Sequence, residues 1–341
     1  MAYTTINKPQ DYFNTKTYTG TGATGNSQTV GFQPDLLWFK NRSTALNHMW
    51  FDSVRGVTKY FYGNLNEAEG TTTAALESID SNGFTVGANN NVNQNTNNIV
   101  AWNWLAGGSA SSNTDGTITS SVSANTTAGF SIVSYTGNGT AGATVGHGLG
   151  VAPDVVIGKN RDTTSTSWAV YHKSIGTDLV FLDATDASAS YSTIYNSTAP
   201  SSSVVTLGSG SNANKNNDEI ILYCFAEKKG YSKFGKYRGN SSTDGTFIYT
   251  GFKPAWFMQK RTDATNGWHI FDLKRDTYNV SGKYLTANQT STEPTGTYLD
   301  ILSNGIKMRR NGADVNQGTY IYMAFAEAPT VGSNNVPATA R

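Results

Sequence analysis

The chain has 341 residues, a formal net charge of +1 and only 14% charged residues, against about 25% in ordinary soluble proteins. This balance excludes the clustered positive charge that holds nucleic acid by its phosphates. The single cysteine, Cys224, excludes a disulfide within the chain, and no run of about 18 apolar residues predicts a membrane span.

Short strand patterns follow one another along the chain, and helical periodicity is almost absent. The best helix candidate, residues 65–77, is short and rich in threonine. In chain order, apolar or aromatic-rich strand patterns occupy residues 36–40, 99–104, 130–135, 155–159, 220–225, 246–250, 256–260 and 320–325. The last has large residues on both faces, as a strand covered on both sides would. Dense Asn-Gly and Asp-Gly turns between these strands predict an all-β protein of antiparallel β-sandwiches, jelly-roll or concanavalin-like.

The same succession of features occurs three times along the chain. Each copy has a tyrosine followed by small residues, a proline-centred step, an apolar run that ends in lysine, a tryptophan, and an aromatic-rich strand. The prolines are Pro34, Pro153 and Pro254. The tryptophans that follow them, after 16, 15 and 14 residues, are Trp50, Trp168 and Trp268. This regular spacing predicts three tandem copies of one domain, with the prolines and tryptophans as its structural signature.

The boundaries of the parts follow from these features. In chain order we expect an N-terminal attachment arm, a first sandwich, a linker, a second sandwich, a third sandwich and a tail, at residues 1–16, 17–107, 108–127, 128–229, 230–329 and 330–341. The linker is inferred from its small polar residues. The second and third sandwiches have almost no linker between them, so we expect them to be rigidly coupled.

Several stretches match a repeat pattern seen in other proteins. They include Asp11-Tyr12-Phe13-Asn14, Gly31-Phe32-Gln33-Pro34-Asp35, residues 50–56 and 146–150, and the endings Phe225-Ala226-Glu227 and Phe325-Ala326-Glu327. Through them the chain resembles a repeat family of lectin-like β-sandwich domains in virion proteins of tailed, especially marine, bacteriophages. The resemblance implies an all-β fold and a virus particle, and it supplies no catalytic residues. The third copy departs from the pattern, because Arg261 directly follows Lys260.

Residues capable of chemistry do not converge in the sequence. The four histidines are His48, His147, His172 and His269, and we expect them at strand ends beside core tryptophans. No histidine or cysteine pair has metal-ligand spacing, so we predict neither a metal nor a cofactor. Asp218 and Glu219 are adjacent and would point to opposite faces of a strand, which argues against the paired carboxylates of a glycosidase. We therefore predict no enzymatic activity.

Aromatic residues outside the signature are the predicted partner contacts. In the N-terminal arm these residues are Tyr3, Ile6, Tyr12 and Phe13, which we expect to fasten the protein to the particle. In the first copy they are Tyr60, Phe61 and Tyr62, which have no counterpart in the other copies. Three consecutive aromatic residues in a strand expose at least one ring unless another layer covers them. For the signature tryptophans we expect a core position, with sugar stacking as the alternative.

These observations together predict a non-enzymatic structural protein on the virion surface. It would be a capsid decoration, a head fibre or a tail-fibre component, and it would act by adhesion to other virion proteins. The alternatives are a lectin-like receptor-binding protein that recognises a host surface glycan at a fibre tip, and a polysaccharide depolymerase. Three copies in one chain permit a pseudo-threefold monomer, and a homotrimer is the competing arrangement.

Overall fold

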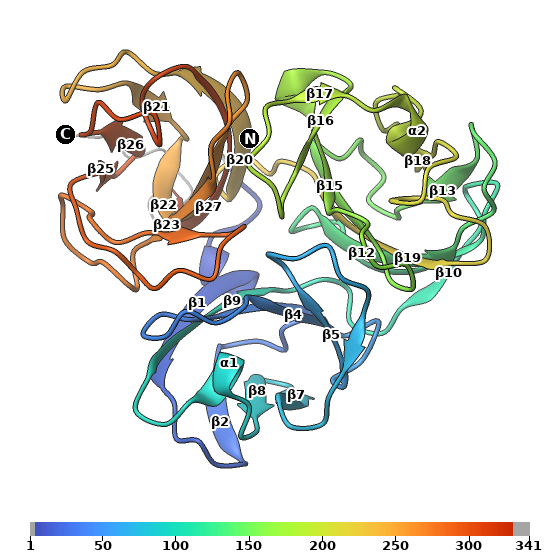
Figure 1. Ribbon diagram of the computed structural model, residues 1–341, viewed down its shortest axis with the longest axis horizontal. Helices are drawn as coiled ribbons and strands as arrows, with labels where there is room; N and C mark the ends of the chain where they lie inside the picture. The colour runs from blue at the N-terminus through green and yellow to red at the C-terminus, as the bar shows by residue number, and fades with distance from the viewer. Residues whose placement is uncertain (1–3, 330–341) are drawn as a thin grey trace.

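The computed structural model describes residues 4–329, which form three β-rich lobes around a common centre (Figure 1). We number the lobes in chain order: lobe 1 comprises residues 4–107, lobe 2 residues 108–229 and lobe 3 residues 230–329. Each lobe contains a large antiparallel sheet and a small sheet, so the predicted all-β sandwich fold is confirmed.

Lobe 1 begins with a single 3-10 turn and contains one short helix. Its large sheet has the strand order β1-β9-β3-β4-β5-β6, and its small sheet has the order β2-β8-β7. The elements are η1 (Pro9–Asp11), β1 (Phe13–Thr19), β2 (Asn26–Thr29), β3 (Leu36–Asn41), β4 (Met49–Asp52), β5 (Lys59–Tyr62), β6 (Gly70–Thr71), β7 (Leu76–Asp80), β8 (Gly83–Val86), α1 (Asn90–Asn93) and β9 (Asn98–Trp104). The best helix candidate of the sequence, residues 65–77, is not helical, because it contains β6 and the start of β7.

Lobe 2 has the widest sheet, ordered β10-β11-β12-β19-β14-β15-β16-β17, and a two-stranded sheet, β13-β18. Its elements are β10 (Ser111–Asn113), β11 (Ser120–Asn125), β12 (Phe130–Thr136), β13 (Thr144–Gly146), β14 (Val155–Asn160), β15 (Ala169–His172), η2 (Lys173–Ile175), β16 (Asp178–Phe181), β17 (Ala189–Ser190), α2 (Ser192–Tyr195), β18 (Val204–Thr206) and β19 (Glu219–Phe225). The predicted linker, 108–127, contains β10 and β11. Small polar residues suit an edge strand whose stability comes from backbone pairing, so composition alone misled that prediction.

Lobe 3 has a five-stranded sheet, β20-β27-β22-β23-β24, and a three-stranded sheet, β21-β26-β25. Its strands are β20 (Ser232–Arg238), β21 (Phe247–Tyr249), β22 (Phe252–Arg261), β23 (Trp268–Asp272), β24 (Leu285–Thr286), β25 (Leu299–Leu302), β26 (Gly305–Met308) and β27 (Thr319–Pro329). The strand orders β1-β9-β3-β4-β5, β12-β19-β14-β15-β16 and β20-β27-β22-β23-β24 occupy matching places in the chain. This agreement supports the three-copy organisation, which stays an inference.

The described residues, 4–329, form four hydrophobic cores. Three lie within the lobes, each between a large and a small sheet. The fourth is central and draws residues from all three lobes, including Trp50, Trp168 and Trp268. Each large sheet is therefore covered on both faces, which explains why β3 and β14 are buried at every position. The three lobes share a core and are not the separate sandwiches expected from the sequence.

Candidate functional site

The signature tryptophans are buried in the central core, with exposed fractions of 0 to 2%, and the prolines Pro34, Pro153 and Pro254 are buried as well. A core position is therefore confirmed for the tryptophans, and sugar stacking is excluded. Strand pairing corrects their alignment, however. Trp50 lies opposite Trp38, a position that Val170 and Ile270 occupy in the other lobes. The lobe 1 residue at the position of Trp168 and Trp268 is His48, which lies two residues before Trp50.

These matched rings join each lobe to a neighbour. His48 Nε2 donates to the Thr286 carbonyl at 3.2 Å. Trp168 Nε1 donates to the Leu65 carbonyl at 3.2 Å, and Trp268 Nε1 to that of Phe181 at 2.8 Å. The contacts run from lobe 1 to lobe 3, from lobe 2 to lobe 1 and from lobe 3 to lobe 2. A closed ring of three equivalent junctions results.

Each of the three junctions also contains a buried lysine. These residues are Lys40, Lys159 and Lys260, all without exposed surface. Their ammonium groups donate across the same junctions, to the carbonyl oxygens of Thr290 at 3.1 Å, Asn66 at 3.4 Å and Asp186 at 2.8 Å, respectively. Burial lowers the pKa of each lysine to about 8. The lysine that ends each apolar run in the sequence is thus part of the contact between lobes.

Two junctions add buried ion pairs. Between lobes 1 and 2, Glu69 accepts from Arg161 Nε at 2.9 Å and from Arg55 Nη1 at 3.1 Å. Between lobes 3 and 1, Glu293 contacts Arg42 at 2.6 Å and Arg275 at 2.8 Å. These carboxylates hold one lobe to the next.

The third junction lacks this pair. Its backbone hydrogen bond, from Ser188 N to the Thr262 carbonyl, has a counterpart in each of the other two junctions. There Glu69 N donates to the Arg161 carbonyl, and Glu293 N donates to the Arg42 carbonyl. Ser188 and Thr262 therefore replace the carboxylate and the arginine together. Arg261, shifted by one residue in the sequence, instead pairs with Asp263 inside lobe 3.

A second set of matched positions shows the same joint replacement. Asp52 accepts from the Tyr223 hydroxyl at 2.7 Å, and Asp272 accepts from Trp102 Nε1 at 2.9 Å. Strand pairing gives Met323 as the lobe 3 equivalent of these two donors. Methionine has no N–H or O–H to donate. Strand pairing likewise gives His172 as the lobe 2 equivalent of the acceptors Asp52 and Asp272. Its Nε2 donates to the Tyr322 carbonyl at 3.1 Å, and burial lowers its pKa to about 4, so it stays neutral.

The predicted N-terminal arm is wrong for the residues that the structure describes. Ile6 and Phe13 are 1% exposed and lie in the central core. Phe13 starts β1, and its ring stacks on Phe325 with centroids 5.1 Å apart. Tyr12 is partly buried and packs edge-on against Tyr231 at 6.0 Å. Tyr3 lies outside the described residues. The side chains of Ile6, Tyr12 and Phe13 complete the core of this chain and are not available to fasten it to a particle.

The aromatic run of β5 is only partly a surface. Phe61 is completely buried, below the Arg55 guanidinium at 4.2 Å and beside Trp168, so its predicted partner contact is wrong. Tyr60 and Tyr62 are half-buried, and their rings meet edge to face at 5.0 Å. The central core supplies the extra layer that covers the middle residue of the run.

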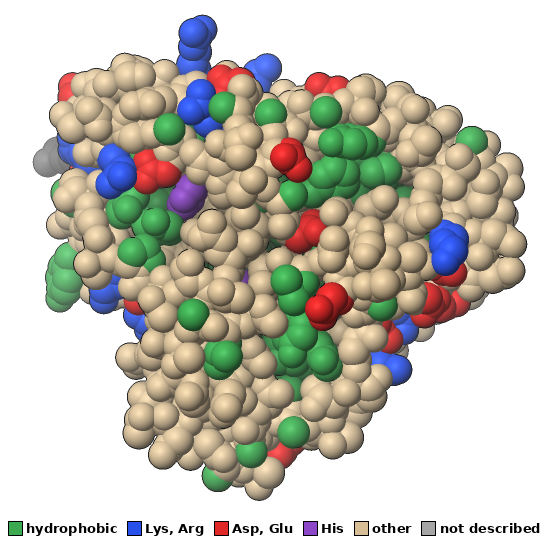
Figure 2. Space-filling view, in the orientation of Figure 1, with side chains coloured by type: hydrophobic (Ala, Val, Ile, Leu, Met, Phe, Trp, Pro, Cys, Tyr) green, Lys and Arg blue, Asp and Glu red, His purple; other side chains and the backbone are tan. Residues whose placement is uncertain are grey.

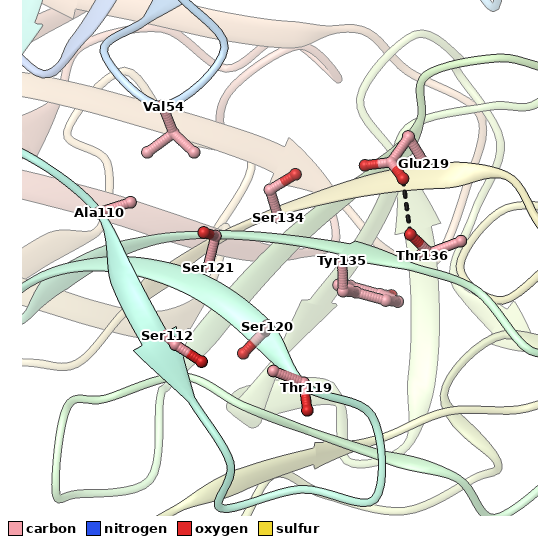
Figure 3. A pocket seen from close by; sticks show the side chains of 10 residues that line it. All are labelled: Val54, Ala110, Ser112, Thr119, Ser120, Ser121, Ser134, Tyr135, Thr136 and Glu219. Carbon is pink, nitrogen blue, oxygen red and sulfur yellow. Dashed lines mark hydrogen bonds between the residues drawn. The ribbon is translucent and has the colours of Figure 1, made fainter.

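A cleft lined by hydroxyl groups opens where lobe 1 faces lobe 2 (Figure 3). Its volume is about 400 Å³, and Ser112, Ser121 and Ser134 lie opposite one another on β10, β11 and β12. Glu219 is the one carboxylate of its lining and accepts from Thr136 Oγ1 at 2.6 Å. Paired-carboxylate hydrolysis needs a second acid roughly 5 to 9.5 Å away, which this lining does not supply. The cleft offers hydrogen bonds to a polar ligand.

Large exposed apolar side chains gather on lobe 3. Among the described residues they are Phe247, Tyr249, Tyr278 and Val280, with Val151 of lobe 2 as the fifth. Charged side chains are scattered over the face seen in Figure 2, with no single cluster of either sign. The strand expected at residues 246–250 is β21, but its exposure was not predicted. The signal was present, because Phe247 and Tyr249 alternate with buried Ile248.

A family model described as "Domain of unknown function (DUF7483)" matches residues 8–329. The chain belongs to this DUF7483 family. No curated protein and no solved structure matches the chain. The DUF7483 match covers all three lobes as one domain, in agreement with their shared core. Within residues 4–329, no group of three or more potential ligand side chains could hold a metal ion, and the helices, of three or four residues each, are too short to cross a bilayer.

Proposed function

We propose that the protein is a non-enzymatic structural component of a virus particle, displayed on its surface and acting by adhesion. The resemblance of its sequence to virion repeat proteins is the starting point. The buried junctions add to it, because they commit His48, His172, the signature tryptophans and the buried lysines to holding three lobes in one rigid body.

The observation that carries the proposal is the difference between matched positions on the small sheets. Strand pairing aligns Phe247 and Tyr249 of β21 with Ser27 and Thr29 of β2. The corresponding residues of β13 are Thr144 and Gly146. Two lobes thus present small residues where lobe 3 presents two aromatic rings, of which Tyr249 is 61% exposed. Exposed aromatic residues are typical of interaction surfaces, so we assign the adhesive contact to lobe 3.

The proposal is tested on virus particles purified by density gradient from the source of this sequence. We expect mass spectrometry to find the protein in the particle band and an antibody against it to label intact particles. A band without the protein would refute the structural role. Labelling that requires disruption of the particle would refute the surface location.

The adhesive face is tested separately with the chain itself. Replacing Phe247 by Ser, the residue at the matched position of lobe 1, should reduce binding to particles that lack the protein while leaving its melting temperature unchanged. The matched control is Val151→Ser, because Val151 is similarly exposed on lobe 2. Equal binding by both variants would contradict the assignment to lobe 3.

A further inference from the structure

A second cleft lies on the flank of β21, where the end of lobe 2 (Glu227 and Lys229) meets lobe 3. Its volume is about 430 Å³, and its lining includes Glu227, Ser232, Lys233, Tyr249 and Thr250. Small-molecule sites are usually about 300–1,000 Å³ and combine an apolar surface with a few placed polar groups. This cleft has both, because one exposed aromatic ring stands beside a carboxylate and an ammonium group.

The polar groups of the cleft are held in place by their neighbours. Lys233 Nζ lies 2.8 Å from Glu227 Oε1, and the amide of Phe234 donates to Oε2 at 3.3 Å. Lys173 approaches Oε2 at 3.5 Å and also pairs with Asp154 at 2.8 Å. The Glu227 side chain is still 23% exposed and that of Lys233 38%. A fixed acceptor and a fixed donor therefore face the cleft, and Lys229 lines it as a third charged residue.

In lobes 1 and 2, the space equivalent to this cleft is occupied by side chains of the lobe itself. In lobe 1, the positions of Tyr249 and Lys233 belong to Thr29 and Asn14, and the Asn14 amide donates to the Val30 carbonyl at 2.8 Å. In lobe 2, the position of Tyr249 belongs to Gly146, where an added Cβ would lie 1.7 Å from Asn113 Oδ1. Only lobe 3 combines an open space with a ring and a charged pair.

We propose that this cleft binds an uncharged sugar residue of a glycan chain. The C–H face of a pyranose ring is apolar and stacks on the exposed ring of Tyr249. Its neighbouring hydroxyl groups are at once donors and acceptors, so one donates to the Glu227 carboxylate and the next accepts from the Lys233 ammonium. Because the acceptor is a carboxylate, it receives a hydrogen bond from a sugar hydroxyl and repels an acidic group on the sugar. The inference rests on the proposed adhesive function and adds a glycan, bound through Tyr249, as a second ligand of lobe 3.

The test uses the full chain on a printed array of neutral oligosaccharides ending in glucose, galactose, mannose or N-acetylglucosamine, with sialylated and sulfated glycans beside them. Titration calorimetry then measures the affinity of the best ligand. We expect binding to neutral glycans. Tyr249→Thr should weaken it about five- to tenfold, and Glu227→Gln about tenfold or more through loss of a charged hydrogen bond.

The matched control is Tyr278→Thr, because Tyr278 is 82% exposed on the same lobe but does not line the cleft. It should bind as the unaltered chain does. Circular dichroism of each variant separates loss of the ligand from loss of the fold. Binding to no neutral glycan, preference for acidic glycans, or equal effects of Tyr249→Thr and Tyr278→Thr would overturn the inference. None of these results bears on whether antibody labels intact particles, so failure of the glycan site and failure of the particle role remain distinguishable.

Discussion

The junction between lobes 1 and 2 provides a quantitative test of how the lobes are held together. Glu69 receives one bond from Arg55 of its own lobe and one from Arg161 of lobe 2. The side chains of Arg55, Glu69 and Arg161 are 0%, 8% and 17% exposed. Breaking a fully buried ion pair costs about 3–5 kcal/mol, because a charge is left without its partner. Since Arg161 keeps some contact with water, we expect Glu69→Gln to lower the free energy of unfolding by about 2–3 kcal/mol.

The third junction suggests the matched double replacement. Glu69→Ser with Arg161→Thr reproduces the uncharged pair formed there by Ser188 and Thr262. Urea unfolding of both single variants and the double variant gives a thermodynamic cycle, for which we expect a coupling energy of about 1–2 kcal/mol. The control is Asp263→Asn, which breaks an exposed pair inside lobe 3 and should cost under about 1 kcal/mol. Additive effects of the two single replacements would refute the reasoning.

The pH dependence gives a second check on the same residue. Burial raises the pKa of Glu69, but bonds from Arg161 and the charge of Arg55 outweigh it and hold the pKa below its usual range. The unfolded chain therefore takes up this proton first as the pH falls. The stabilisation is present above the ordinary glutamate pKa and is lost as the pH falls through the folded value. We expect the difference in stability between the unaltered chain and Glu69→Gln to shrink in acid, and a constant difference would contradict the ion-pair explanation.

Three further predictions follow from the buried groups. Because burial lowers the pKa of Lys40, Lys159 and Lys260 to about 8, the unfolded state binds more protons than the folded state between pH 8 and 10. The free energy of unfolding should therefore rise in this range by up to about 1.4 kcal/mol per pH unit for each lysine, and this slope should be smaller in Lys40→Met. An equal slope in Lys40→Met would mean that the surrounding carbonyl groups keep the lysine charged. Phe13→Ala should destabilise the protein by about 3–5 kcal/mol, as measured by urea unfolding, whereas a freely extending arm would tolerate the change. Because one chain completes the central core, light scattering should give a mass near 36.6 kDa, and a threefold larger mass would favour the homotrimer.

The fold class and most strands could be predicted from the sequence because alternating apolar residues and glycine-rich turns are local signals. Residues 320–325 even carried a signal for the central core, since large side chains on both faces of β27 require a layer on each side. The partners of that second layer could not be predicted. They come from the other lobes, as when Trp102 of lobe 1 bonds to Asp272 of lobe 3, and no spacing within one copy specifies such a contact.

The errors at the site have physical reasons. The alignment of Trp50 with Trp168 and Trp268 used a spacing that tolerates a shift of two residues, and such a shift keeps a side chain on the same face of a strand. Ile6 and Phe13 were interpreted as an arm because they precede the first copy, yet apolar side chains at a chain end are also buried when a core has room for them. Tyr249 was missed although Phe247 and Tyr249 alternate with Ile248, because alternation does not say which face of a strand is buried. Comparison with the small residues Thr29 and Gly146 at the matched positions indicates that the face of Tyr249 is the exposed one.

Calorimetric unfolding tests most directly the claim that three lobes form one body through a shared core. We expect a single heat-absorption peak whose calorimetric enthalpy equals the van't Hoff enthalpy, because loss of any junction exposes the central core to water. Separate transitions for individual lobes would contradict the account.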